Sequence, residues 1–545
     1  MRLNRFLNPR PDAPLPLWMI FPVIFAALYA SHFTLLRVPY YWDEAGYYIP
    51  AAWDFFRTGS LIPVTTLSNA HPPLPSIYLA LWWKLSGFYP EVTREAVLMV
   101  AALGLLGVWR LAKRVTGVAS VAFWTVLLTG LYPIWFAQSS LAHADIFAAA
   151  CTLWGLIYAL PSQDRNPRTA FLWFATAALC KETSIAIPLT LAAVRLIDGL
   201  RESKEARREL LGEAAWLTAC VFPLAGWYTY HYAKTGFLFG NPEYLRYNAE
   251  ATLAPLRILA AFGHRILHLT AHMNLFVPVG MGFAALLLTP RTDATGKERV
   301  GIDHNVRRNI FVLLLMEAIL FSCIGGALLT RYLLPMYPLV LLLAVTAIYR
   351  RVPYWRALAA LSAAAFIAGT FINPPYGFAP EDNIAYARVV RMHLAGIAQL
   401  TKQAPASTVL TAWPMTDELT RPELGYVKQA WDVDRIEDFT EGQIAHAADE
   451  PEKYSAALVF STKYDPPSPL LSLGAASQAL DERYFGLHHD MAPEAIAQRL
   501  GGTLLWKRED QGMWIALIKF DRQLDARVER RDQSPHDALH HALPQ

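Results

Sequence analysis

Charged residues and cysteines are scarce in this chain, and each shortage excludes a class of protein. Only 17% of the 545 residues are charged and 54% are hydrophobic, which is more apolar surface than one soluble core needs. A net charge of only +3 argues against nucleic acid as a partner, because phosphate binding normally requires a strongly basic domain or stripe. The four cysteines lie in apolar segments and indicate no disulfide framework. These shortages predict a membrane protein.

Long apolar runs fill the first two thirds of the chain. The first, residues 17–36, exceeds the usual 7–15 residues of a signal-peptide core, so we predict an uncleaved anchor. Residues 169–199 are interrupted by Lys181 and Glu182 and are predicted as two short helices that meet at a charged bend. The other runs of spanning or nearly spanning length are 92–112, 118–137, 141–160, 211–232, 272–290, 309–328, 332–349 and 355–372. The predicted fold class is a polytopic α-helical membrane protein with about 11 transmembrane helices.

Basic residues gather in alternate loops between these runs. They lie at 110–114, 165–168, 201–208, 291–308 and 350–356. If the N-terminus is cytoplasmic, all five loops are inside, as the bias of Lys and Arg toward the cytoplasm requires. An odd number of spans then places the remainder of the chain outside. The prediction is a multi-pass protein of the inner (cytoplasmic) membrane, with its C-terminal domain periplasmic or otherwise exterior.

Beyond residue 372 the composition becomes that of a soluble domain. A helix is predicted over 384–402 and strands over 407–412 and 456–462, followed by the β-patterned runs GTLLWKR and GMWIALIKF. The predicted division is a membrane domain over 1–372, a small exterior α/β domain over 373–526, and a disordered tail over 527–545.

Two adjacent acids, Asp43 and Glu44, stand beside Trp42 and several tyrosines at the start of the first exterior loop, residues 37–91. Other unusual polar residues map to the same predicted face of the membrane, namely His71, Asp145, Lys181, Glu182, Arg331 and Tyr332. Ionisable groups near hydrocarbon are costly and usually face a cavity or one another. Their common side therefore predicts a single pocket.

Each of these residues also has a purely structural interpretation. Asp43 or Asp145 could cap the start of a helix, since aspartate accepts hydrogen bonds from free backbone N–H groups. His71 could simply end an irregular segment. Lys181 and Arg331 could extend to the interface, as basic residues at helix ends commonly do. Their exterior position runs against the inside bias and favours a role in binding phosphate.

Three histidines, His264, His268 and His272, recur at helical spacing and would line up on one helix face. Such a row could hold zinc, although an interfacial helix with hydrogen-bonded imidazoles is the commoner case. No cofactor is indicated with certainty. The residue types leave open whether a divalent metal ion bridges Asp43 and Asp145.

Together these segments resemble a known fold. The acid pair, the HPPL turn before an aromatic helix, the aspartate of the fourth span, the lysine break and RYLLPMYP resemble the C-type (GT-C) membrane glycosyltransferases. Within them, the protein O-mannosyltransferases and the lipid A aminoarabinose transferases are the most similar families. The resemblance covers roughly residues 15–372. It implies an enzyme that transfers a sugar from a polyprenyl-phosphate donor to a lipid, glycan or protein acceptor outside the cytoplasmic membrane.

The resemblance also implies residue roles. Asp43 corresponds to the family's first-loop acid, which acts on the acceptor nucleophile, with Glu44 beside it, and Asp145 corresponds to the second acid. Two positions depart from the family pattern. Gln138 stands where relatives often carry arginine, and Glu182 stands where they often carry glycine.

The residue types suit this reaction. A carboxylate can take the acceptor's proton in the transition state, and Lys181 and Arg331 can stabilise the charge on the departing phosphate. Trp42 and the tyrosines offer stacking surface for a sugar or lipid, or form an interfacial aromatic belt. If the base and the leaving group lie on opposite faces of the sugar, the transfer inverts the anomeric centre.

Two alternative functions remain open at this stage. A lipid or solute transporter or flippase would also be polytopic, but transporters usually place polar sites near the midplane between repeated halves. The sequence shows no internal repeat. A membrane scaffold with a partner-binding exterior domain would leave the acids unexplained. The gathering of charges at one interface favours the enzyme.

Overall fold

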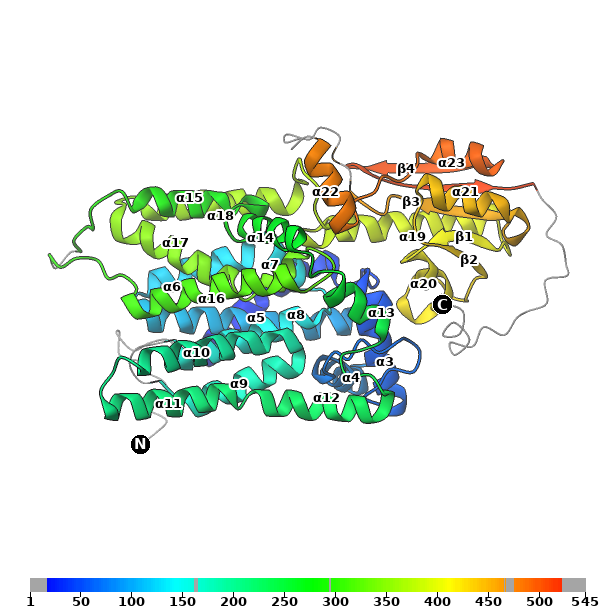
Figure 1. Ribbon diagram of the computed structural model, residues 1–545. Helices are drawn as coiled ribbons and strands as arrows, with labels where there is room; N and C mark the ends of the chain where they lie inside the picture. Colours follow the sequence, from blue (N-terminus) through cyan, green and yellow to red (C-terminus); the bar gives the residue numbers. More distant parts are fainter. Residues whose placement is uncertain (1–16, 161–164, 294–295, 465, 467–474, 522–545) are drawn as a thin grey trace.

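The computed structural model describes residues 17–160, 165–293, 296–464, 466 and 475–521. A bundle of long helices is joined to a smaller unit that contains a β-sheet (Figure 1). The arginines ahead of the first apolar run and the polar tail predicted to be disordered lie outside the described residues.

The helices of the bundle follow the predicted apolar runs. They are α2 (Leu17–His32), α5 (Pro90–Thr116), α6 (Ala119–Leu131), α7 (Pro133–Gln138), α8 (Ala144–Ala159), α9 (Pro167–Cys180), α10 (Ala186–Gly199), α11 (Lys204–Thr218), α12 (Val221–Thr235), α14 (Pro255–Thr270), α15 (Phe276–Ala285), α16 (His304–Cys323), α17 (Tyr337–Arg351) and α18 (Trp355–Phe371). The predicted charged bend is confirmed, because α9 and α10 are separated by Lys181 and the 3-10 helix η3 (Glu182–Ile185).

Only some of these helices are long and apolar enough to cross a membrane unaided. Within the described residues they are Leu17–Leu35, Pro90–Thr116 and Lys204–Thr235, and the pair Pro255–Asn274 and Phe276–Ala285, bent by 100°, passes the same test together. Ala119–Leu131, Ala144–Ala159 and Trp355–Phe371 are apolar but shorter, below the about 20 residues that a straight span requires. The count of eleven spans therefore stays a prediction.

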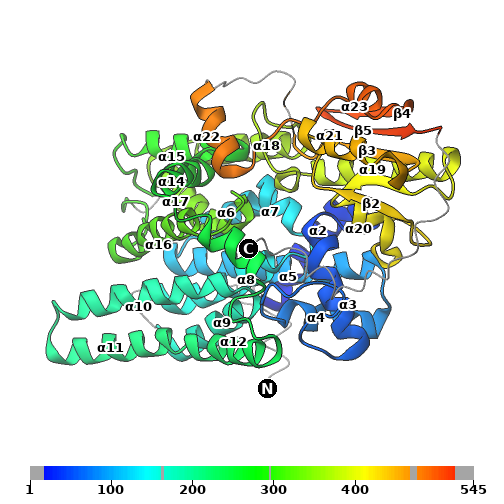
Figure 2. The same cartoon turned by 45° about the vertical axis from the view of Figure 1, so that its right-hand side comes forward.

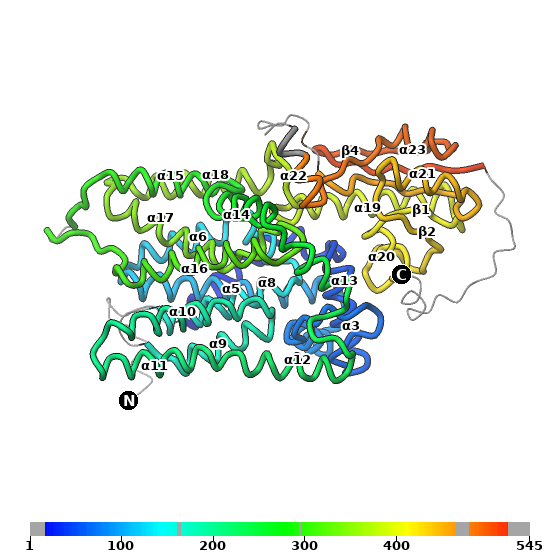
Figure 3. The backbone as a smooth tube through the Cα atoms, in the orientation of Figure 1, coloured from blue at the N-terminus to red at the C-terminus, as the bar shows by residue number. Residues whose placement is uncertain are grey.

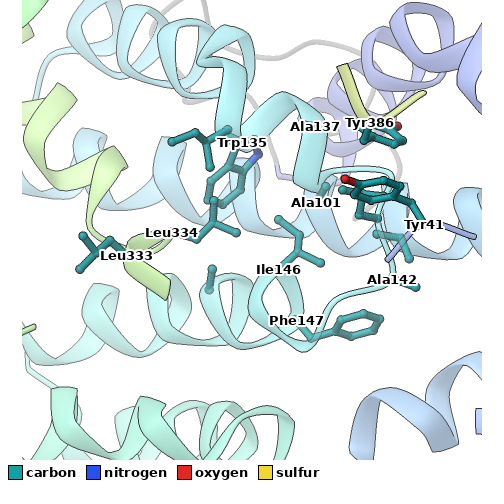
Figure 4. Packing of buried hydrophobic residues seen from close by; sticks show 14 of the residues in the cluster. Tyr41, Ala101, Trp135, Ala137, Ala142, Ile146, Phe147, Leu333, Leu334 and Tyr386 are labelled. Atoms are coloured by element: carbon teal, nitrogen blue, oxygen red, sulfur yellow. The ribbon is translucent and has the colours of Figure 1, made fainter. Parts of the chain in front are cut away.

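Close packing holds the bundle together. A Cβ on Gly155 of α8 would lie 2.6 Å from the ring of Phe174 on α9, so only glycine permits this approach. Trp135, Ile146 and Leu334 point toward one another from α7, α8 and the segment before α17 (Figure 4), and all three are fully buried. These contacts bring η6 (Thr330–Leu333) close to the start of α8.

Short helices gather at one end of the bundle. The first loop forms η2 (Glu44–Tyr48), α3 (Ile49–Thr58) and α4 (Leu74–Ser86), and the segment after α12 forms α13 (Pro242–Leu245) and η4 (Arg246–Glu250). Figure 1 shows α3, α4 and α13 at the same end as the sheet unit. Trp42, just before η2, has a positive φ of 49°, which is strained for a bulky residue. The chain thus turns sharply beside Asp43.

The sheet unit has five strands in the order β2-β1-β3-β5-β4. They are β1 (Val409–Ala412), β2 (Val433–Ile436), β3 (Ala456–Phe460), β4 (Thr503–Asp510) and β5 (Met513–Lys519). β1 is parallel to β2 and β3, whereas β5 is antiparallel to β3 and β4. The helices are α19 (Ala385–Gln403), α20 (Met415–Thr420), α21 (Glu441–Asp449), α22 (Ala475–Phe485) and α23 (Pro493–Leu500), with the 3-10 helices η7 (Pro380–Asp382), η8 (Pro422–Leu424) and η9 (Pro451–Lys453). The predicted helix and strands of a small α/β fold are confirmed.

The chain passes from α18 through η7 and α19 into the sheet unit (Figure 3). α19 packs closely on the sheet at Gly396, where an added Cβ would lie 2.6 Å from the side chain of Ile515. The unit also packs on the first loop, where Tyr426 donates a hydrogen bond of 2.8 Å to the backbone oxygen of Tyr40. In Figure 2, α20 lies above α3. The sheet unit is therefore docked at the end of the bundle that carries the predicted acids.

Candidate active site

Arg331, in η6, connects several carboxylates at this end of the bundle. Its Nη2 donates to Asp43 Oδ2, and its Nη1 lies 2.5 Å from both carboxylate oxygens of Glu381. Its Nε lies 3.4 Å from Asp145 Oδ2. The Arg331 side chain is 3% exposed, whereas the Asp43 side chain is 34% exposed. Asp43 therefore forms the accessible edge of a buried charge cluster.

Lys181 completes the cluster from the break between α9 and α10. Its Nζ donates to Asp145 Oδ1 and lies 4.1 Å from the centre of the Tyr332 ring. Asp145 therefore lies between two cations. The alternative in which Lys181 and Arg331 extend to the interface is not what the structure shows, since both side chains are buried.

A cleft opens beside these groups. Asp145, Lys181, Arg331 and Tyr332 line it together with Glu317 of α16. The Nε of Arg331 and the Oδ2 of Asp145 have no hydrogen-bond partner among the described residues. The ion pair at 3.4 Å satisfies their charges but leaves hydrogen-bonding capacity for a ligand.

Glu44 lies apart from this cleft and is completely buried. Arg94 of α5 donates to it twice, at 2.5 and 2.9 Å, and the backbone N–H groups of Tyr41 and Ala142 donate at 2.9 and 2.6 Å. Each Glu44 oxygen thus accepts two hydrogen bonds. The arrangement ties the first loop to the segment before α8, so Glu44 holds the backbone just before Asp43 and just before Asp145.

His71 and Glu182 form a neighbouring pair. His71 Nδ1 lies 3.0 Å from Glu182 Oε2, and its Nε2 lies 3.4 Å from the hydroxyl of Tyr244. His71 also lines a second pocket with Tyr47 and Tyr48. The glutamate that departs from the family pattern thus fixes the orientation of the predicted histidine.

The helix-capping alternative for the two aspartates finds no support. Asp43 precedes η2 and Asp145 lies inside α8, but neither side chain makes a capping hydrogen bond within the described chain. Trp42 meets Trp413 of the sheet unit edge to face, with ring centroids 4.6 Å apart. Trp413 was not expected from the sequence, because the contact joins segments about 370 positions apart.

Other important residues also escaped sequence analysis. Glu381 and Asp382 lie in the turn after the last apolar run, in the sequence APEDN, and two acids so close to a membrane segment were a usable signal. Asp382 pairs with His272 at 2.9 Å and accepts a hydrogen bond from Thr330, the neighbour of Arg331. Arg94 gave a weaker signal: it is a cation near the exterior end of the predicted span 92–112.

Gln138 has a definite place despite its departure from the family pattern. Its amide nitrogen donates to the Glu381 backbone oxygen at 3.3 Å, and its oxygen lies 2.9 Å from His143 Nδ1. His143 Nε2 lies 4.0 Å from the Glu381 carboxylate. The glutamine therefore helps to position Glu381 against Arg331.

Burial raises the pKa of Glu381 to about 8, although Arg331 acts in the opposite direction. Asp43, Asp382 and Asp145 add to the rise by repulsion. Glu381 therefore changes charge close to neutral pH.

The three histidines of α14 and its following turn lie side by side, with ring centroids 6.4 Å apart for His264 and His268 and 5.2 Å apart for His268 and His272, but the outer two pair with different acids. His264 lies 3.6 Å from Asp481 of α22, whereas His272 pairs with Asp382. Across the described ranges, no three His, Cys, Asp or Glu side chains gather as a metal site. Asp43 and Asp145 both contact Arg331, and a divalent ion between these two aspartates stays a prediction.

Comparison with known proteins gives one family match. Residues 70–227 match the model of the dolichyl-phosphate-mannose-protein mannosyltransferase family. They include His71, Asp145 and Lys181. No curated protein sequence matches the chain.

Two solved structures of ArnT from Cupriavidus metallidurans are similar to the whole chain. The structure bound to undecaprenyl phosphate has a TM-score of 0.51 at 15% identity and covers 92% of this chain and 97% of that chain. The apo structure has a TM-score of 0.49 at 15% identity, over 92% and 98% of the two chains. The predicted resemblance is therefore confirmed: the chain has the C-type glycosyltransferase fold seen in ArnT, and residues 70–227 match a mannosyltransferase family model.

Proposed function

We propose that the protein is a membrane glycosyltransferase that moves a sugar from a polyprenyl-phosphate donor to an acceptor at the exterior face of the membrane. The observation that carries this proposal is the contact of one guanidinium, Arg331, with Asp43, Asp145 and Glu381 beside a cleft. A carboxylate that can accept a proton and cations that can hold a phosphate thus occupy one cluster. The mannosyltransferase family match and the fold of ArnT, whose structure holds undecaprenyl phosphate, support the proposal.

Asp43 is the general base in this mechanism. Its side chain keeps about a third of its surface accessible, so an acceptor hydroxyl or amine can reach it. As the acceptor's lone pair forms a bond to the anomeric carbon, the acceptor's proton passes to Asp43. A positioned base of this kind typically contributes about 10²–10⁴ in rate.

Lys181 and Arg331 act on the leaving group. The bond between the anomeric carbon and the phosphate oxygen breaks, and its electron pair stays on the phosphate. Cations that are already in place stabilise that charge strongly where water is excluded, and both side chains are buried. The Arg331 Nε–H, without a hydrogen-bond partner in the described part of the chain, is a donor that a phosphate oxygen can use.

Attack from the Asp43 side and departure on the Lys181 side make the transfer a single displacement that inverts the anomeric centre. Trp42 and Tyr332 flank these two sides and offer aromatic faces to the sugar. The polyprenyl chain remains in the bilayer throughout. Each methylene group withdrawn into water would cost about 0.8 kcal/mol, so a site at the membrane boundary avoids extracting the chain.

The decisive experiment uses purified protein in lipid nanodiscs and a panel of polyprenyl-phosphate sugars with lipid, glycan and peptide acceptors. Wild type should consume at least one donor and release polyprenyl phosphate, and Asp43→Asn should lose this activity. Asp449→Asn, an exposed site at the end of α21, is the matched control. Equal consumption by wild type and Asp43→Asn would remove Asp43 from the mechanism. No consumption of any donor by wild type would favour the transporter alternative.

A further inference from the structure

Glu317 is a buried acid that the mechanism above does not use. It lies on α16, in an apolar segment, and is 2% exposed. Its Oε1 has no hydrogen-bond partner within the described residues, and no ion pair reaches it from them. An unpaired carboxyl at such a depth is costly, which indicates that a bound molecule supplies the missing partner.

The position of Glu317 suggests which molecule this is. Glu317 lines the same cleft as Lys181 and Arg331, the two cations assigned to the donor phosphate. It lies about two turns before the end of α16 at Cys323, so α16 brings it to the cleft. Thr183 and Ser184 add hydroxyl groups to the same wall. Together with Lys181 and Arg331, these groups give the cleft polar partners that suit a phosphate.

The charge balance of the cluster favours an uncharged Glu317. Lys181 and Arg331 already pair with the carboxylates of Asp43 and Asp145, and Arg331 also pairs with Glu381 once Glu381 ionises. A phosphate would bring further negative charge, and one more carboxylate would repel it. A protonated carboxyl avoids this repulsion and offers an O–H donor, as buried acids without a cation beside them prefer.

We propose that Glu317 is part of the phosphate subsite and donates a hydrogen bond from its protonated carboxyl to the phosphate of the lipid donor. This inference rests on the proposed function. The O–H group supplies a hydrogen-bond donor, while Lys181 and Arg331 supply charge. No bond is broken at Glu317, and its proton remains on the carboxyl.

An isosteric pair of variants tests the donor role. Glu317→Gln keeps an N–H donor without a charge, whereas Glu317→Ala removes the donor. Binding of undecaprenyl phosphate to the full chain in nanodiscs should weaken about tenfold in Glu317→Ala and stay within about threefold of wild type in Glu317→Gln. As the pH rises above neutral, wild type should lose affinity more steeply than Glu317→Gln, because only glutamate can ionise. A structural role alone would not produce this difference in pH profile.

Each outcome decides the question. Wild-type affinity in Glu317→Ala, or an equal loss in both variants, overturns the proposal, since the first shows no contact and the second shows that the negative charge itself is needed. If Glu317→Ala does not fold, the affinity and pH profile of Glu317→Gln decide alone. Inorganic phosphate, tested as a competitor, shows whether the phosphate group suffices without its tail. Failure of wild type to bind undecaprenyl phosphate would instead contradict the proposed function.

Discussion

Arg331 donates a hydrogen bond to Asp43 across 288 positions of sequence. The contact joins the first loop to the segment between α16 and α17, and Glu381 joins the same guanidinium from the turn after α18. One side chain thus links the proposed base to the proposed phosphate site.

Arg331→Lys should weaken donor binding by at least about tenfold. A lysine has a single charged nitrogen and cannot contact Asp43, Asp145 and Glu381 in the directions that a planar guanidinium does. Titration with undecaprenyl phosphate measures the effect. Arg356→Lys, at an exposed site on α18, is the control, and equal affinities of both variants would show that the guanidinium geometry is unimportant.

Glu44→Gln should destabilise the fold by about 3–5 kcal/mol, because Arg94 would remain as a buried cation without its counter-charge. The double variant Glu44→Gln/Arg94→Gln should lose less than the sum of the two single variants. Thermal unfolding in detergent measures each change. The control is Glu91→Gln in the exposed pair with Arg37, where a loss of only about 0–1 kcal/mol is expected. Additive losses at Glu44 and Arg94 would contradict a coupled pair.

Donor affinity should fall as the pH rises through about 8, the value to which burial raises the pKa of Glu381. Below that pH Glu381 is largely protonated, so it does not neutralise Arg331, and the positive charge of Arg331 attracts the donor phosphate. Above it, ionised Glu381 competes for Arg331, so the donor binds less tightly. Glu381→Gln should remove this part of the pH dependence. If donor affinity still falls equally steeply at alkaline pH in Glu381→Gln, another group causes the pH dependence.

Trp413→Ala should raise the acceptor KM about 2- to 10-fold and leave the donor Kd unchanged. Its edge-to-face contact with Trp42 is of a kind worth about 0.5–1.5 kcal/mol, and Trp42 is the residue next to Asp43. Steady-state kinetics with the acceptor varied provides the measurement. Trp506→Ala on the edge strand β4 controls for general effects on the sheet unit. A change in the donor Kd rather than the acceptor KM would show that the Trp42–Trp413 contact supports donor binding, and would contradict the prediction.

Local pattern predicted much of this architecture. The apolar runs, the break at Lys181 and the strands around Val409, Ala456 and Thr503 depend on neighbouring residues, since hydrophobic periodicity and charge interruption act over a few positions. The same reasoning assembled Asp43, Asp145, Lys181 and Arg331 as candidates, and the structure brings all four together.

The local sequence pattern could not distinguish two neighbouring residues that have different roles. Asp43 and Glu44 are adjacent acids, yet one is partly exposed beside Arg331 and the other is buried against Arg94. Which of them would meet an arginine from α5 depends on how the turn at Trp42 directs each side chain. That direction is set by packing against distant helices.

By itself the sequence determined that the chain is a membrane protein and singled out the ionisable residues beside its apolar runs, because the cost of placing charge in hydrocarbon acts on every segment separately. Only the tertiary structure decided that Glu381 and Gln138 belong to the cluster, that Glu44 supports the backbone, and that Glu317 faces the cleft. These relationships arise between segments that hydrophobic packing brings together, and the free energy of an ion pair is settled by the burial and partners it finds there.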